Sequence, residues 1–353
     1  MENNTFKSFF KKIDINSLQL ICQLIIIYFA SYKVSKIYEM YKESLPKDIN
    51  TILKSPNNHL LFTEFKDNFQ HLDIISTFIY TLFKHFNTED LTIFWNNITT
   101  LSIEVKDSLS SSQGYYIYNN EGLNKIEIEK RILIPSIYHE LFHVASTNRF
   151  TKGISFCGFS QGNNKQIIGK GLNEGYTELL TQRYFGLNED ISDAYIYLTI
   201  ISSLLESIVD KDKMQSLYLK ADLFNLINEL AKYASENEIM KFIASTDFLL
   251  DYLDSKPQII EKRIILNSLK FVNYFLIKCS VNKNLLEAKK GLISNNKAKS
   301  NINLFVSKLL NEIKTNGIKY KIMNDEFIER SIISSYNEFY TKYNKALEYQ
   351  LKK

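Results

Sequence analysis

Residues that interrupt helices are scarce in this chain, which has 4 prolines and 11 glycines among its 353 residues. Because few breakers favour long helices, most of the chain is expected to be helical. Residues 1 to about 88 read as helical, with a turn near Leu45–Asn58. The C-terminal half reads as nearly continuous helix, interrupted at Pro257 and in the polar linker Ser294–Asn301.

Strand-forming patterns are confined to the middle of the chain. Leu101–Val105, Tyr115–Tyr118 and Lys125–Glu129 alternate or cluster β-forming residues, and Asn119–Gly122 reads as the turn between the last two. Gly153–Gln161 reads as a further strand or hairpin. The chain is therefore expected to be α+β and mostly helical, with regions at 1–95, 96–190 and 191–353.

A metal-binding pattern follows these strands in the sequence IYHELFHVAS, which contains His139, Glu140 and His143 in the spacing H-E-x-x-H. The pattern predicts a helix that Ser136 caps and that ends near Thr147. Residues four apart lie on one helix face, so the two imidazoles would meet at one point suited to zinc. Glu140 would stand beside that point as a general base.

The alternative is that these histidines are ordinary residues of an amphipathic helix. The residues around them are apolar: Ile134, Ile137, Leu141, Phe142, Val144 and Ala145. Such a helix is expected to be largely buried, and buried polar groups need partners. A metal ion would supply them.

A second polar pair lies on the predicted helix Asn173–Phe185, after Gly162–Gly171, which we expect to be a flexible loop. Glu174 and Glu178 are four residues apart, so both carboxylates face one way. We expect Glu174 to be the third metal ligand and Glu178 to accept a hydrogen bond from a ligand histidine. The exchange of these two roles and a solvated helix face remain the alternatives. Gly175 would let this helix approach the H-E-x-x-H helix closely.

HELFH and the downstream NEGYTE together resemble the gluzincin zinc metallopeptidases, over about Lys125–Gly186. The resemblance implies a zincin-like catalytic core with a small sheet, beside a large helical C-terminal region. It also implies that Lys125–Glu129 is the edge strand along which substrate is aligned. The gap between HELFH and NEGYTE is longer than in compact gluzincins and contains the strand-like insertion.

The resemblance assigns residues to the reaction. It implies that His139, His143 and Glu174 bind one Zn²⁺ per chain and that Glu178 supports a ligand histidine. Glu140 would activate a zinc-bound water that hydrolyses a peptide bond of a peptide or protein substrate. The donor that stabilises the oxyanion stays open among 22 tyrosines. Alternatives are a non-catalytic zincin-like or helical interaction protein, and a metal-dependent hydrolase of other substrates.

Charge and cysteines restrict the partners and the compartment. The net charge of +4 is spread along the chain, which gives no reason to expect nucleic acid as a partner. Three widely spaced cysteines form no disulfide framework and no C-x-x-C zinc site. Residues 15–32 are uncharged and just long enough to span a bilayer, but several polar residues weaken that reading. We expect a cytoplasmic protein, with a single-pass membrane anchor at 15–32 as the alternative.

Overall fold

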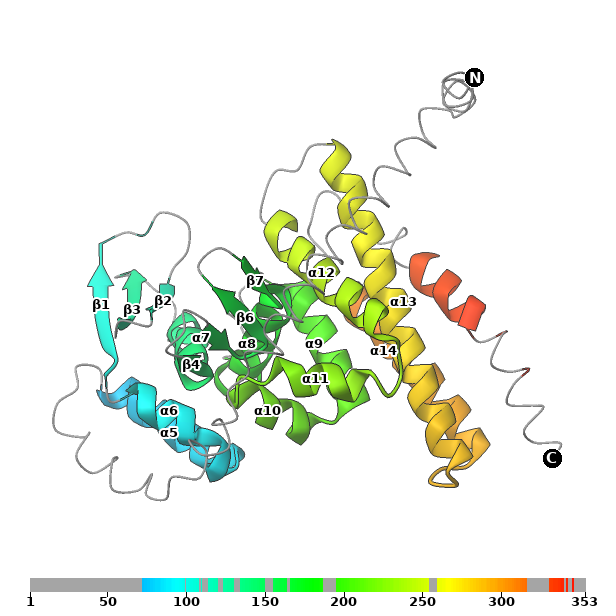
Figure 1. Cartoon of the computed structure of the whole chain (residues 1–353), viewed down its shortest axis with the longest axis horizontal. Coiled ribbons are helices and arrows are strands. Elements are labelled where there is room, and N and C mark those ends of the chain that lie inside the picture. Colours follow the sequence, from blue (N-terminus) through cyan, green and yellow to red (C-terminus); the bar gives the residue numbers. More distant parts are fainter. Residues whose placement is uncertain are drawn as a thin grey trace, which may run out of the picture.

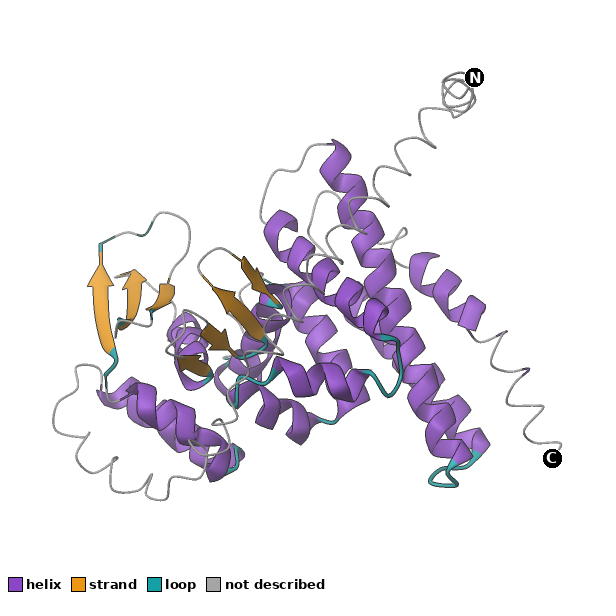
Figure 2. Ribbon diagram, viewed as in Figure 1, coloured by secondary structure: helices purple, strands orange, loops and turns teal. Residues whose placement is uncertain are grey.

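The structure is a computed structural model. It describes residues 72–98, 100–107, 109, 114–119, 123–129, 134–149, 155–163, 166–186, 195–253, 259–315, 330–339, 341 and 345. Within these residues the protein is mostly helical with two small sheets, which confirms the expected α+β class (Figure 2). The candidate anchor at 15–32 lies outside the described residues, as does the turn expected at 45–58.

The first sheet contains three strands, β1 (Ser102–Lys106), β2 (Gly114–Tyr118) and β3 (Asn124–Glu129), at the positions where the sequence predicted them. β3 alternates buried and half-buried residues, which is typical of a strand with one face on the core. Its inward residues include Ile126 and Ile128, which are buried.

The strand order corrects one expectation. The order is β1-β3-β2, with β1 parallel and β2 antiparallel to β3. β3 is therefore paired on both sides and cannot be the edge strand that aligns a substrate. β2 is an edge strand, and it packs against the helix that carries the two histidines.

That helix is α7 (Ile134–Ala145), which begins before Ser136 and not after it. Among the described residues, three helical elements precede the first sheet: α5 (Leu72–His85), η1 (Thr88–Leu91) and α6 (Thr92–Ile98). α6 packs against α7, and buried residues from both belong to one hydrophobic core. The division of the chain into three regions stays a prediction.

A second sheet lies between α7 and the next helix. It consists of four strands in sequence order, β4 (Thr147–Arg149), β5 (Ser155–Cys157), β6 (Ser160–Asn163) and β7 (Gln166–Ile168), each antiparallel to the next. The hairpin expected within 153–161 is present as β5 and β6. The expectation of a flexible loop over Gly162–Gly171 was wrong, because β6 continues to Asn163 and β7 pairs with it.

The remaining helices form the larger part of the molecule. They include α8 (Lys170–Phe185), α9 (Ile196–Val209), α10 (Lys211–Leu219), α11 (Leu223–Leu230), α12 (Glu236–Leu253), α13 (Ile259–Lys289) and α14 (Asn295–Thr315), and a further helical segment covers 330–339. Figure 1 shows the first sheet at one end, the long helices α12 to α14 towards the other, and α7 and α8 between them. α8 packs against α7, α9 and α12, so it joins the helical half to the histidine helix.

Two further expectations concern helix breaks. The break expected near Pro257 lies outside the described residues, which resume with α13 at Ile259 after α12 ends at Leu253. The linker expected at Ser294–Asn301 is instead the first two turns of α14, where Ala298 and Ile302 are buried. A single apolar residue per turn anchors these polar turns, which is why composition alone did not reveal the helix.

Among the described residues, one helical segment is long and apolar enough to cross a membrane, Ile264–Lys289 of α13. Of the residues in its most apolar stretch, 67% are buried inside the protein. This is typical of the core helix of a folded domain.

Candidate metal centre

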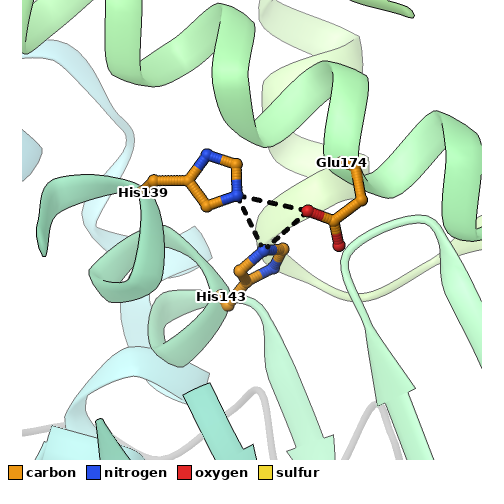
Figure 3. Close-up of side chains that lie close together, drawn as sticks. All are labelled: His139, His143 and Glu174. Carbon is orange, nitrogen blue, oxygen red and sulfur yellow. Dashed lines mark hydrogen bonds and ion pairs between the residues drawn. The ribbon is translucent and has the colours of Figure 1, made fainter. Parts of the chain in front are cut away.

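Three side chains that the sequence predicted as ligands lie together between α7 and α8 (Figure 3). His139 and His143 come from one face of α7, and Glu174 points at them from α8. Their potential ligand atoms all lie within 4.8 Å of one another. His139 and His143 are both 7% exposed, so the cluster is largely withdrawn from solvent.

The distances within this cluster suit one small metal ion. The Nε2 atoms of His139 and His143 are 3.1 Å apart, and they lie 3.2 Å and 3.4 Å from Glu174 Oε2. Ligands at tetrahedral corners about 2.0 to 2.1 Å from zinc would be about 3.3 Å apart. The three atoms therefore already lie close to three corners of a zinc-sized tetrahedron, and the His-His-Glu donor set is one that zinc accepts.

Electrostatics couple the three groups. Burial alone would lower the pKa of His139, but hydrogen bonds with Glu174 and Glu178 outweigh it and raise that pKa to about 9. Burial alone would raise the pKa of Glu174, but the two histidines hold it well below its usual range. The cluster thus combines a carboxylate with basic imidazoles in a buried place, where a divalent cation could replace protons.

Glu178 contacts the other nitrogen of His139. Its Oε2 lies 3.0 Å from His139 Nδ1, and its Oε1 accepts a hydrogen bond of 3.0 Å from Gln182 Nε2. Glu178 is therefore on the far side of the ring from Glu174. This is the geometry of the expected supporting residue, and the exchange of the two glutamates would require the ring to turn over.

Glu140 is half-buried and lies next to β2. Burial raises the pKa of its carboxyl group, and a hydrogen bond from the backbone of Tyr116 in β2 partly opposes that rise. Glu140 lies outside the three-residue cluster that could hold a metal. Its predicted role beside a metal, and not on it, stays a prediction.

The end of α7 is fixed beside His143. Thr147 Oγ1 donates a hydrogen bond of 2.7 Å to the carbonyl oxygen of His143. Asn97 Nδ2 donates to the carbonyl oxygens of Val144, at 2.8 Å, and Thr147, at 2.5 Å. Because these bonds tie the last turn of α7 and the start of β4 to Asn97 and Thr147, the histidine helix ends in a defined place.

The start of α8 is fixed from another helix. Gly169 at its N-cap offers no side chain, and Asp247 of α12 fulfils that role. Asp247 Oδ2 accepts from Gly169 N and Oδ1 accepts from Gly171 N, both at 2.8 Å. The helical half of the chain thus helps to position the helix that carries Glu174.

Gly175 behaves differently from what the sequence suggested. A Cβ atom there would lie 2.5 Å from the carbonyl oxygen of Leu198 in α9. The close approach is therefore between α8 and α9, and the expectation of close approach to α7 was wrong. Tyr176 belongs to the same interface, since its hydroxyl donates to Glu206 Oε1 at 2.8 Å. Arg183 binds both carboxylate oxygens of Glu206.

The structure brings two tyrosines to the cluster that the sequence did not single out. The ring of Tyr195 stacks on His139, with 5.9 Å between ring centroids. Tyr195 has a φ of 62°, in the left-handed region, which is a strained conformation for a residue with a side chain. Tyr118, at the end of β2, is close enough to interact electrostatically with His143 and Glu174. No spacing rule would have selected either residue.

The fold and cluster together define a mostly helical α+β protein with a His-His-Glu group that could hold a metal ion. Comparisons with protein-family models, with curated proteins and with solved structures found no match for this chain.

Proposed function

We propose that this chain is a zinc-dependent metallopeptidase in which His139, His143 and Glu174 hold one zinc ion. The observation that carries the proposal is the mutual spacing of their three ligand atoms, 3.1, 3.2 and 3.4 Å. Catalytic zinc sites use three protein ligands and leave a fourth position open to water or substrate. Zinc bound here would supply a Lewis acid and a more acidic water.

Glu140 is the general base of the proposed reaction. It follows His139 in the sequence. It lies beside the edge strand β2, where the backbone of Tyr116 hydrogen bonds to its carboxyl group. A carboxylate at this place can take a proton from the attacking water and pass it to the leaving amine. Its half-buried position keeps it reachable by substrate.

A peptide is the substrate class that the local fold favours. β2 is an edge strand of its sheet and packs against α7. An extended peptide can pair with such an edge through main-chain hydrogen bonds, which places its carbonyl groups along α7. We propose on this basis that the first sheet, α7 and α8 form a zincin-like core.

Tyr195 is the proposed donor to the oxyanion that forms during peptide hydrolysis. Its ring lies against His139, and its backbone is in the left-handed region, a strained conformation of the kind often found at functional sites. Tyr118 is the competing candidate, since it is close enough to interact electrostatically with His143 and Glu174.

The test is cleavage of a peptide library by zinc-loaded protein, with products identified by mass spectrometry. Glu140→Gln is the matched control, because it keeps the shape of the side chain and removes the base. The proposal predicts cleavage at defined sites by the wild type and cleavage at least about 100-fold slower by the variant. No cleavage by folded, zinc-loaded wild type, or equal cleavage by both proteins, would overturn the peptidase assignment.

A further inference from the structure

Cys157 contacts His143 on the side of the ring that faces away from the cluster. It is the last residue of β5 and is 4% exposed. Its Sγ lies 3.6 Å from His143 Nδ1 and 3.8 Å from the carbonyl oxygen of the same residue. The thiol is therefore placed where a partner of Nδ1 would be.

Asn173 is the other side chain at this nitrogen. Its Oδ1 accepts a hydrogen bond of 3.2 Å from the backbone N–H of Phe159. Since a backbone N–H can only donate, this bond fixes the orientation of the amide. Asn173 Nδ2 then points at His143 Nδ1, at 3.3 Å, and at Cys157 Sγ, at 3.8 Å. Both N–H bonds of this amide nitrogen are hydrogen-bond donors.

The tautomer of His143 decides which neighbour can form a hydrogen bond with its Nδ1 atom. A histidine that binds a metal through Nε2 carries its proton on Nδ1, so Nδ1 needs an acceptor. Asn173 Nδ2 cannot accept. Among the contacts of His143 Nδ1 in the described part of the chain, Cys157 Sγ is the group that can accept that proton.

The tight turn between β5 and β6 keeps these groups in place. Gly158 donates from its backbone N–H to the carbonyl oxygen of Ser146 at 2.9 Å. Its φ is 53°, and a Cβ atom there would collide with Asn173 Oδ1 and with the ring of Tyr218. The hairpin is thus seated directly on Asn173, and little movement is open to Cys157.

We propose that Cys157 is a positioning residue that accepts the Nδ1–H hydrogen bond of His143. It would do for His143 what Glu178 does for His139. The inference rests on the proposed metal site, and it gives the β5–β6 insertion a role in building that site. In this arrangement Asn173 Nδ2 donates to Cys157 Sγ at 3.8 Å, and its N–H groups have to point away from the protonated Nδ1 at 3.3 Å.

The test compares zinc affinity in three variants by competition with a chelator. Cys157→Val removes the acceptor at similar volume, and loss of such a supporting partner is expected to weaken zinc binding by about 10- to 100-fold. Cys157→Ser supplies an oxygen acceptor and should retain most of the affinity. Cys279→Val is the matched control, because Cys279 is equally buried but lies on α13. The melting temperature of each metal-free variant checks folding.

The outcomes separate this inference from the proposed function. Tight zinc binding by wild type and by Cys157→Val alike would overturn the role of Cys157 and leave the metal site intact. Equal losses in the Val and Ser variants would assign Cys157 to packing alone and also overturn it. Wild type that binds no zinc would overturn both proposals.

A second readout does not depend on a folded variant. Nitrogen-15 NMR of the imidazoles in zinc-loaded wild type should show His143 protonated at Nδ1, with that proton hydrogen bonded. An unprotonated Nδ1 would contradict the inference directly.

Discussion

Glu174 and Glu178 contact opposite nitrogens of one imidazole ring. Glu174 Oε2 lies 3.2 Å from His139 Nε2, and Glu178 Oε2 lies 3.0 Å from His139 Nδ1. One turn of α8 therefore holds both sides of a side chain on α7. Only Glu174 also contacts His143, at 3.4 Å. Glu174 is therefore the proposed metal ligand, and Glu178 is the proposed partner that supports the His139 ring.

The first prediction concerns the base. Glu140→Gln should bind zinc as the wild type does, since Glu140 lies outside the ligand cluster. Its peptide-cleaving activity should fall by about 100- to 10,000-fold, the range expected when a general base is removed. Metal content by mass spectrometry and turnover of a cleaved library peptide check the two halves. Loss of zinc from this variant would mean that Glu140 is a ligand.

The second prediction concerns the oxyanion donor. Tyr195→Phe should lower the turnover number by about 100- to 1,000-fold and leave zinc binding unchanged, because only the hydroxyl is removed. Tyr184→Phe is the control, since Tyr184 hydrogen bonds with Gln215 and its ring contacts that of His85, away from the cluster. A comparable loss in Tyr118→Phe, with Tyr195→Phe fully active, would move the role to Tyr118.

The third prediction concerns packing of the helix that carries Glu174. Gly175→Ala places a methyl group 2.5 Å from the carbonyl oxygen of Leu198, which forces α8 and α9 apart. The free energy of unfolding should fall by about 1 to 3 kcal/mol, the usual cost of overpacking. Urea denaturation measures it.

Gly291→Ala is the control for that experiment. Gly291 has a φ of 73° with nothing within 4 Å of an added Cβ atom. It should lose about 1 kcal/mol through backbone strain and bind zinc normally. A Gly175→Ala protein as stable as the wild type would contradict the close approach of α8 and α9.

The fourth prediction concerns pH. Burial raises the pKa of Asp247 to about 7, and hydrogen bonds from Gly171 and Gly169 only partly oppose the rise. Because the folded state holds this proton more tightly than the unfolded state, the contribution of Asp247 to stability is greatest at low pH. It falls as pH rises from about 4 to about 7, by at most about 1.4 kcal/mol per pH unit.

Asp247→Asn isolates that contribution. The Asn side chain cannot ionise. The unfolding free energy of the wild type should therefore fall relative to that of the variant as pH rises from 5 to 8. Asp251→Asn is the control, since Asp251 is one turn away, more exposed and paired with Lys170. A difference that does not change with pH would contradict the raised pKa.

The sequence predicted those parts of the site that depend on local geometry. A spacing of four residues on a helix brings His139 and His143 to one point, and it places Glu174 and Glu178 one turn apart. Neither result requires knowledge of the rest of the chain. The three strands of the first sheet were also recognisable, because alternation of buried residues is a local pattern.

The features that the sequence did not predict depend on contacts between distant segments. Strand order decides that β2 and not β3 is an edge, and no pattern within β3 reveals its second neighbour. The partner of Gly175 is α9, about 20 residues further along the chain. Tyr195 contacts the cluster from the start of α9 and Cys157 from the β5–β6 hairpin, so only the folded arrangement identifies them.

The central claim is that His139, His143 and Glu174 form a zinc site, and metal stoichiometry tests it most directly. Purified wild type, Glu174→Ala and Glu178→Ala should each be loaded with zinc, dialysed and analysed by mass spectrometry. The account predicts about one zinc per chain in wild type, none in Glu174→Ala, and weaker but measurable binding in Glu178→Ala. A folded wild type that holds no zinc after loading, or a loss confined to Glu178→Ala, would contradict it.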